Sequence, residues 1–183
     1  LALHIAVATS LTRQHNREYM RVAIGVWLSC AAFFSFLIAA PANPFLSVAP
    51  AADGPGPDAL LQNHLLMVIH PPFLYLGYVG MTIPFGLACA ALIQGRLGHS
   101  ILKPLRAALM VPWIFLTIAI MLGGWWAYEV LGWGGYWAWD PVENASLLPW
   151  LTATAALHSL VVLERRGVLK GRSITLIPSP FLL

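Results

Sequence analysis

Four long stretches of uncharged, mostly apolar residues dominate the pattern of the chain. They cover about residues 22–40, 71–93, 108–126 and 147–163, and about 17–25 such residues are enough to cross a bilayer as a helix. Apolar residues run continuously in these stretches, which favours helices over the alternating strands of a membrane barrel. The pattern predicts an all-α protein: a polytopic transmembrane helical bundle forming a single membrane domain over residues 1–183, with residues 1–11 as the tail of a fifth span.

Lysine and arginine are confined to one set of connecting segments. The chain has 10 of them, and none falls in residues 41–63 or 127–146, whose charged residues are all acidic. Segments rich in Lys and Arg stay on the cytoplasmic side of a membrane. The segments without them are therefore predicted to face the opposite side, the periplasm or its equivalent.

The composition excludes a water-soluble globular domain. Hydrophobic residues make up 59% of the chain and charged residues 9%, against about 25% charged residues in soluble domains. The net charge of +3 comes from short basic clusters and not from one basic face, so nucleic acid is excluded as a partner. Cys30 and Cys89 lie inside apolar stretches, so we interpret them as apolar filler and not as redox or zinc-binding residues.

A segment rich in tryptophan and glycine, residues 125–150, stands out on the predicted outer side. It holds six of the eight tryptophans: Trp125, Trp126, Trp133, Trp137, Trp139 and Trp150. An interfacial aromatic belt needs fewer rings than this at a helix end. The glycines mixed with these rings permit the close approach of something flat: Gly123, Gly124, Gly132, Gly134 and Gly135. The alternative is a packed interfacial loop.

The same segment contains the sequence pattern of a helix start. Asp140, Pro141 and Glu143 follow the order of an N-cap, a first helical residue and a capping-box partner. This structural role is favoured over a ligand contact for Asp140. The fourth helix is therefore predicted to begin at Pro141, with the aromatic loop anchored over its N-terminal end.

Two histidines are candidate ligands by position alone. His70 precedes two prolines, and a residue before proline is pushed out of the α region, so we expect His70 at the outer lip where the second helix begins. His158 lies inside the fourth apolar stretch, and an intramembrane ionisable residue is a functional candidate. The alternative for His70 is a histidine at a helix boundary that bonds to backbone. The alternative for His158 is a histidine that hydrogen-bonds across helices. His64 is expected beside the site or near headgroups, without a ligand role.

Two motifs resemble a known family. The sequence WGGYWAWDPVENASLLPWL resembles the tryptophan-rich WWD motif of haem-handling proteins of cytochrome c maturation. Upstream, LLQNHLLMVIHPPFLYLGYVG resembles the segment of CcmF-type haem lyase subunits that carries an outward-facing histidine. CcmC-type haem exporters share the first motif, but the His-Pro-Pro-x-x-Tyr-x-Gly-Tyr order is closer to CcmF.

The resemblance implies a cofactor and a set of residues that hold it. It implies non-covalent b-type haem, with His70 ligating iron on the outer face and His158 ligating a separate haem within the membrane. The implied haem-binding residues are His70, His158, Trp125, Trp126, Trp133, Trp137, Trp139, Asp140 and Asn144. No side chain is expected to act as a catalytic nucleophile. The outer segments carry no Lys or Arg for the haem propionates, so indole N–H groups, helix dipoles or Asn144 would have to serve.

The resemblance also implies partners and a location. Haem would be presented to the Cys-x-x-Cys-His of apocytochrome c, in a bacterial inner membrane with the Trp-rich loop in the periplasm. Other maturation subunits, a haem chaperone and a quinol as electron donor would take part. The alternatives are a haem exporter of the same WWD family and a non-catalytic membrane scaffold.

The chain departs from the family in what it lacks. A second outward histidine and a second membrane histidine have no counterpart here, the first residue is not Met, and no signal peptide precedes the first apolar stretch. Residues 173–183 contain two prolines and are predicted to be too short and broken to span. We therefore expect a piece of a longer protein, inactive as a haem lyase by itself.

Overall fold

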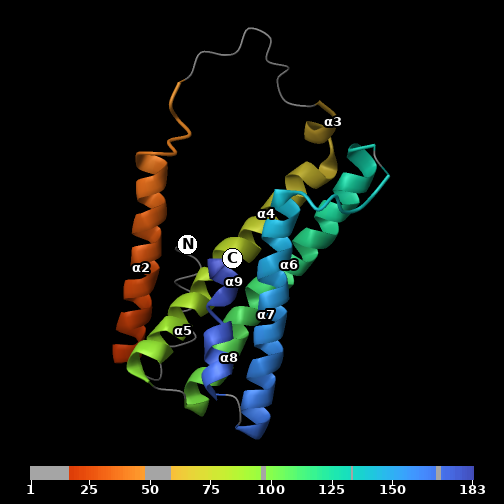
Figure 1. Cartoon of the computed structure of the whole chain (residues 1–183). Helices are drawn as coiled ribbons and strands as arrows, with labels where there is room; N and C mark the ends of the chain where they lie inside the picture. Colours follow the sequence, from red (N-terminus) through yellow and green to blue (C-terminus); the bar gives the residue numbers. More distant parts are fainter. Residues whose placement is uncertain (1–16, 48–58, 96–97, 133, 168–169) are drawn as a thin grey trace.

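The computed structural model describes residues 17–47, 59–95, 98–132, 134–167 and 170–183. Within these ranges it is a bundle of helices without strands, which confirms the all-α prediction (Figure 1). The helices are α2 (Arg17–Ala39), α3 (Ala59–Gln62), α4 (Leu65–Gly80), α5 (Thr82–Gln94), α6 (His99–Val130), α7 (Pro141–Arg166), α8 (Lys170–Leu176) and α9 (Ser179–Leu182). The expected fifth span at residues 1–11 lies outside the described ranges.

Four segments are long and apolar enough to cross a membrane, as the sequence predicts. They are Arg17–Ala39, Leu65–Gln94, Ile101–Val130 and Pro141–Arg166. Each contains the corresponding predicted stretch almost completely and extends beyond it at one or both ends. The extensions carry polar and charged residues, which interrupt an apolar stretch but satisfy helical backbone geometry equally well.

The start of α4 corrects one expectation. His64 is its N-cap, and the His64 Nδ1 atom accepts a hydrogen bond from the backbone N–H of Leu66 at 3.2 Å. Pro71 and Pro72 therefore lie inside the helix, and His70 lies more than one turn from its start and not at the lip. The restriction that proline places on the preceding residue is overridden here, because the capped turn before it already fixes the helix.

The helices pack in a fixed order around a common core. The most extensive contacts among the described helices join α4 to α6, followed by α2 with α5 and α6 with α7. α2 is docked by Trp27, whose indole N–H donates to the Thr82 carbonyl at 2.9 Å. A side chain at Gly86 would collide with the Trp27 ring, its Cβ lying 2.1 Å from Nε1. The missing side chain at Gly86 thus allows α2 to reach α5.

The end of the chain folds back onto the bundle. α8 and α9 pack against α7, with Ile174 and Ile177 buried (Figure 1). Ser173 is also buried, and its hydroxyl pairs with that of Ser159 at 2.6 Å. The sequence indicates a broken segment here but not its packing, because prolines and short length mark helix breaks without showing where the pieces dock.

Candidate functional site

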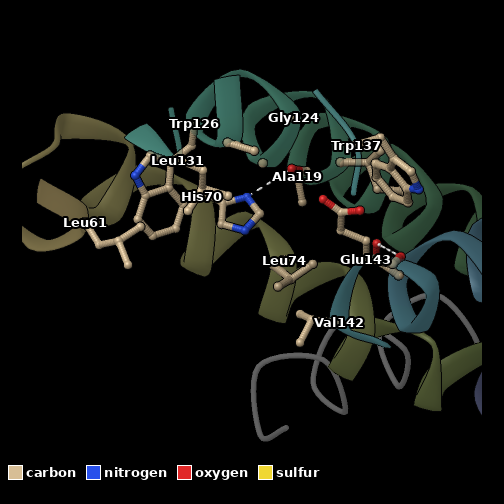
Figure 2. Close-up of a pocket in the computed structure, with 14 residues that line it drawn as sticks. Leu61, His70, Leu74, Ala119, Gly124, Trp126, Leu131, Trp137, Val142 and Glu143 are labelled. Atoms are coloured by element: carbon tan, nitrogen blue, oxygen red, sulfur yellow. Dashed lines mark hydrogen bonds between the residues drawn. The ribbon is translucent and has the colours of Figure 1, made fainter. Parts of the chain in front are cut away.

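A small cavity lies where α4 begins, α6 ends and α7 begins. Its volume is about 180 Å³, and its lining includes His70, Trp126, Trp137 and Glu143 (Figure 2). Trp126 and Trp137 lie on opposite sides of His70 in that view. The cavity therefore brings together one predicted iron ligand and two of the predicted tryptophans, from segments far apart in the sequence.

The orientation of His70 is fixed by a hydrogen bond between helices. Its Nδ1 lies 2.9 Å from the carbonyl oxygen of Ala119 on α6. A carbonyl oxygen only accepts, so the ring proton is on Nδ1 and the lone pair on Nε2. This is how proteins orient a histidine for a metal, with the second nitrogen anchored to a backbone carbonyl or carboxylate.

Two glycines of α6 make room for protein groups. A Cβ at Gly123 would lie 2.9 Å from Cε1 of His70, and a Cβ at Gly124 would lie 3.2 Å from the Tyr136 carbonyl oxygen. The sequence predicts that these glycines admit something flat. In the structure the flat group beside Gly123 is the His70 imidazole, while Gly124 lets the tryptophan loop pack onto α6.

The predicted helix start at Pro141 is confirmed, and it organises the tryptophan loop. Asp140 is the N-cap of α7 and accepts from the Glu143 N–H at 2.7 Å. The Glu143 side chain reaches further back than the expected capping box: one carboxylate oxygen accepts from the N–H groups of Ala138 and Trp139, at 2.7 and 2.8 Å. Asn144 donates to the Trp139 carbonyl at 3.1 Å.

These contacts hold an unusual backbone conformation. Trp139 has a φ of 59°, in the left-handed region that non-glycine residues rarely adopt. Asp140 bonds to the first turn of α7 and Asn144 to the loop, and their predicted role in haem binding stays a prediction. Glu143 was not among the predicted site residues, although it lines the cavity and shapes the loop.

The predicted tryptophans take different positions. Trp126 lies beside His70, with ring centroids 5.8 Å apart, and Trp137 lines the same cavity. The indole N–H groups of both are buried, and neither has a hydrogen-bond partner within the part of the chain that the structure describes. Trp139 is exposed and meets Trp137 edge-on, at a centroid distance of 6.2 Å. Trp133 lies outside the described residues.

A polar triad of His64, Glu129 and Trp125 joins the start of α4 to the end of α6. His64 Nε2 lies 2.7 Å from one oxygen of Glu129, and the other oxygen accepts from the Trp125 indole N–H at 2.5 Å. His64 Nδ1 already accepts from the Leu66 N–H, so the ring proton is on Nε2 and is donated to Glu129. The sequence places His64 near the site without a role. His64 directly precedes the apolar residues 65–69, and this position is the signal that could have indicated an N-cap.

His158 occupies a different place, on the exposed surface of α7. Its Nδ1 donates to the Thr154 carbonyl one turn earlier at 2.8 Å, which again leaves the lone pair on Nε2. His158 does not line the cavity around His70. In each histidine, Nδ1 is bonded to a backbone carbonyl, and Nε2 has no hydrogen-bond partner among the described residues.

The donor set fits a haem better than a bare metal ion. Groups of three or more His, Cys, Asp and Glu that could hold a metal are absent from the described part of the chain. A haem iron needs only an axial imidazole from the protein, because the macrocycle supplies the other ligands. The free Nε2 atoms and the aromatic walls fit this requirement, while the lining residues of the cavity contribute no Lys or Arg for propionates.

Comparisons with known proteins agree on one family. A family model described as "Cytochrome C assembly protein" matches residues 1–182. The cytochrome c-type biogenesis protein CcmF of Pseudomonas aeruginosa is 46% identical over 178 residues, which are 95% of this chain and 27% of that protein. The cytochrome c-type biogenesis protein CycK of Bradyrhizobium diazoefficiens is 47% identical over 156 residues, 85% of this chain and 23% of that protein.

A solved structure agrees with the sequence matches. The structure of the cytochrome c haem lyase CcmF aligns with a TM-score of 0.79 at 36% identity, covering 98% of this chain and 28% of that chain. The chain thus spans about a quarter of the length of these relatives. The membrane character and the resemblance inferred from the two motifs are confirmed. The chain belongs to the cytochrome c assembly protein family and is similar to about a quarter of the length of its CcmF-type members.

Proposed function

We propose that this chain binds haem against His70 and presents it on the outer membrane face for covalent attachment to apocytochrome c. The observation that carries the proposal is the His70–Ala119 hydrogen bond, which fixes the imidazole and leaves Nε2 free in a cavity walled by Trp126 and Trp137. The similarity to a solved cytochrome c haem lyase supports the same chemistry.

The size of the cavity supports a site that presents haem at the surface rather than one that encloses it. At about 180 Å³ it is smaller than the about 300–1,000 Å³ of ordinary ligand pockets. A flat macrocycle would enter by one edge and leave the rest outside, beside the exposed side chains of Trp139 and Val142. An exposed edge is what a second protein needs in order to react with it.

The chain itself holds and orients, and it provides no nucleophile. A bound haem would supply two vinyl groups, to which the substrate's two cysteine thiols add with the proton of each thiol going to the vinyl carbon that sulfur does not take. Cys30 and Cys89 lie in the candidate spans and not at the cavity. The rate gain would come from proximity, with His70 and the tryptophan loop fixing the acceptor in place.

The membrane site forms the second part of the proposal. His158 would ligate a b-type haem on the surface of α7, which is exposed in this chain and would be covered in a protein about four times as long. Such a haem, reduced by a quinol, would keep the outer iron ferrous. Apocytochrome c, other maturation subunits and a haem chaperone are the proposed partners, and the bacterial inner membrane, with the loop in the periplasm, is the proposed location.

A haem titration of the detergent-purified chain tests both sites. We expect a saturable Soret shift with ferrous haem, part of which is lost in His70→Ala and the remainder in His158→Ala. His99→Ala, at the opposite end of α6, is the matched control and should bind as the wild type does. Absence of any shift in the wild-type chain would contradict haem binding by this chain.

The same variants separate the lyase from the exporter. A carrier that works only at the outer face has no need of an intramembrane ligand. If His158→Ala leaves the whole spectrum unchanged while His70→Ala abolishes it, the exporter is favoured. Loss of a membrane b-type spectrum in His158→Ala favours the lyase subunit.

A further inference from the structure

Two tryptophans and two threonines form a reciprocal pair of hydrogen bonds between α6 and α7. Trp113 on α6 donates its indole N–H to the Thr154 hydroxyl on α7 at 2.8 Å. Trp150 on α7 donates to the Thr117 hydroxyl on α6, also at 2.8 Å. We call Trp113, Thr117, Trp150 and Thr154 the Trp–Thr clasp.

Each threonine of the clasp is itself held by its own helix. The Thr117 hydroxyl donates to the Trp113 carbonyl and the Thr154 hydroxyl to the Trp150 carbonyl, both at 2.7 Å. Each hydroxyl proton is thereby committed, so the oxygen is free to accept the indole proton from the other helix. The two indoles stack at a centroid distance of 6.4 Å and an interplanar angle of 13°.

This arrangement specifies one displacement of α6 along α7. Apolar packing alone discriminates weakly between neighbouring displacements in a membrane, because lipid tails are as apolar as the side chains. A shift of one helical turn, about 5.4 Å, would break both cross-helix bonds at once and leave two indole N–H groups and two hydroxyls mispaired. The clasp makes such a shift costly, and the Arg106–Glu164 ion pair, at 3.2 Å, joins the same two helices nearer the start of α6.

The clasp adjoins the anchors of both histidines. Thr154 is a member of the clasp, and its carbonyl accepts the Nδ1 proton of His158. On α6, Ala119 lies two residues after Thr117, and its carbonyl accepts the Nδ1 proton of His70. The groups that orient the two imidazoles are thus carried by the two helices that the clasp joins.

We propose that the Trp–Thr clasp is a positioning device that sets the relative depth of the His70 and His158 imidazoles, and with it the separation of the two haems. The inference rests on the proposed function for the haems, but its structural part, the fixed displacement of α6 along α7, does not. The clasp residues do not contact Nε2 of either histidine, and they act by positioning the helices.

Single hydroxyl deletions test this, because valine has nearly the shape of threonine. We make Thr117→Val and Thr154→Val in the full chain and measure haem dissociation from each site, in His158→Ala and His70→Ala backgrounds. The decisive expectation is an effect across the interface. Thr117→Val, on α6, should change the rate of haem dissociation from His158, and Thr154→Val, on α7, should change the rate from His70. From the usual strength of interhelical hydrogen bonds in membranes, we expect about a threefold change in the dissociation rate for each single variant. The double variant should show an only slightly larger change, because the clasp acts as a unit.

Two controls separate positioning from general weakening. Among the described residues, the Thr152 hydroxyl bonds only to carbonyls of its own helix, so neither haem should respond to Thr152→Val. Tyr19→Phe removes a buried bond from α2 to the Leu87 carbonyl, so it should lower the melting temperature without changing haem loss. If each threonine variant alters only the haem on its own side, or if Tyr19→Phe has the same effect, the proposal is wrong.

A haem-free measurement keeps the inference separate from the proposed function. Near-ultraviolet circular dichroism reports the stacked Trp113–Trp150 pair in the apoprotein, and its signal should fall in both threonine variants but not in Thr152→Val. If the wild-type chain binds no haem, this signal still tests the fixed displacement. An unchanged signal in both threonine variants would overturn the clasp, whatever the outcome with haem.

Discussion

The two histidines differ in what holds their imidazoles. His70 is anchored across a helix interface, its Nδ1 donating to the Ala119 carbonyl of α6 at 2.9 Å. His158 is anchored within its own helix, its Nδ1 donating to the Thr154 carbonyl four residues earlier at 2.8 Å. Both keep Nε2 free, but only the orientation of His70 depends on how two helices meet. Changes confined to the α4–α6 interface should therefore alter haem binding at His70, the outer site, and leave haem binding at His158, the membrane site, unchanged.

A methyl group at Gly123 should have the largest effect and should separate the two histidines most clearly. In Gly123→Ala the new Cβ would lie 2.9 Å from Cε1 of His70, so the ring has to move away from the Ala119 carbonyl. Losing the anchor of a metal-binding histidine lowers affinity about 10–100-fold. We expect that loss for haem at the outer site, measured by titration in a His158→Ala background.

The membrane site and a second glycine provide the controls for this variant. Haem binding through His158, measured in a His70→Ala background, should be unaffected by Gly123→Ala. Gly25→Ala adds the same methyl group to α2 at a place where no atom lies within 4 Å, and it should leave both sites unchanged. An equal loss at both sites in Gly123→Ala would mean that the bundle, and not the His70 ring, had been disturbed.

The tryptophan loop should respond next most strongly, through Glu143. Glu143→Ala removes the oxygen that accepts from the N–H groups of Ala138 and Trp139, so the left-handed turn at Trp139 loses its support. Two hydrogen bonds of about 0.5–1 kcal/mol each correspond to about 5–30-fold faster amide exchange in the loop. Hydrogen–deuterium exchange over residues 134–139 measures it.

The matched control here retains the oxygen and removes the charge. A glutamine oxygen can accept both N–H bonds, so Glu143→Gln should exchange at close to the wild-type rate. If Glu143→Gln opened the loop as far as Glu143→Ala does, the charge and not the two hydrogen bonds would be what holds it. Amides around His158 should exchange as in the wild type in both variants.

Sequence patterns predict the parts of this molecule that are decided locally. Continuous apolar stretches identify the four spans, and the order of Asp140, Pro141 and Glu143 identifies the start of α7, because a cap involves residues within one turn of each other. The same local reasoning fails at His70, where two prolines suggest a helix start that the cap at His64 places earlier.

The anchors of the site could not be predicted, because they join distant segments. The Ala119 carbonyl lies 49 residues from His70, and the Glu129 carboxylate lies 65 residues from His64. A backbone carbonyl has no sequence signature, so nothing marks Ala119 as a partner. The tryptophans were recognisable as a group, but whether each one lines the cavity depends on which way α6 and the loop turn.

The weakest expected effect concerns the triad of His64, Glu129 and Trp125. It separates the role of His64 as the N-cap of α4 from its bond to Glu129. Asparagine is a good N-cap, so His64→Asn keeps the start of α4 but removes the bond to Glu129. Both partners are partly exposed, and exposed pairs contribute little, so we expect only about a twofold weakening of haem at His70. His64→Ala removes the cap as well, which costs about 1 kcal/mol of stability. Thermal unfolding should therefore distinguish the two variants more clearly than haem titration does. Equal melting temperatures for them would mean that His64 acts through Glu129 and not as a cap.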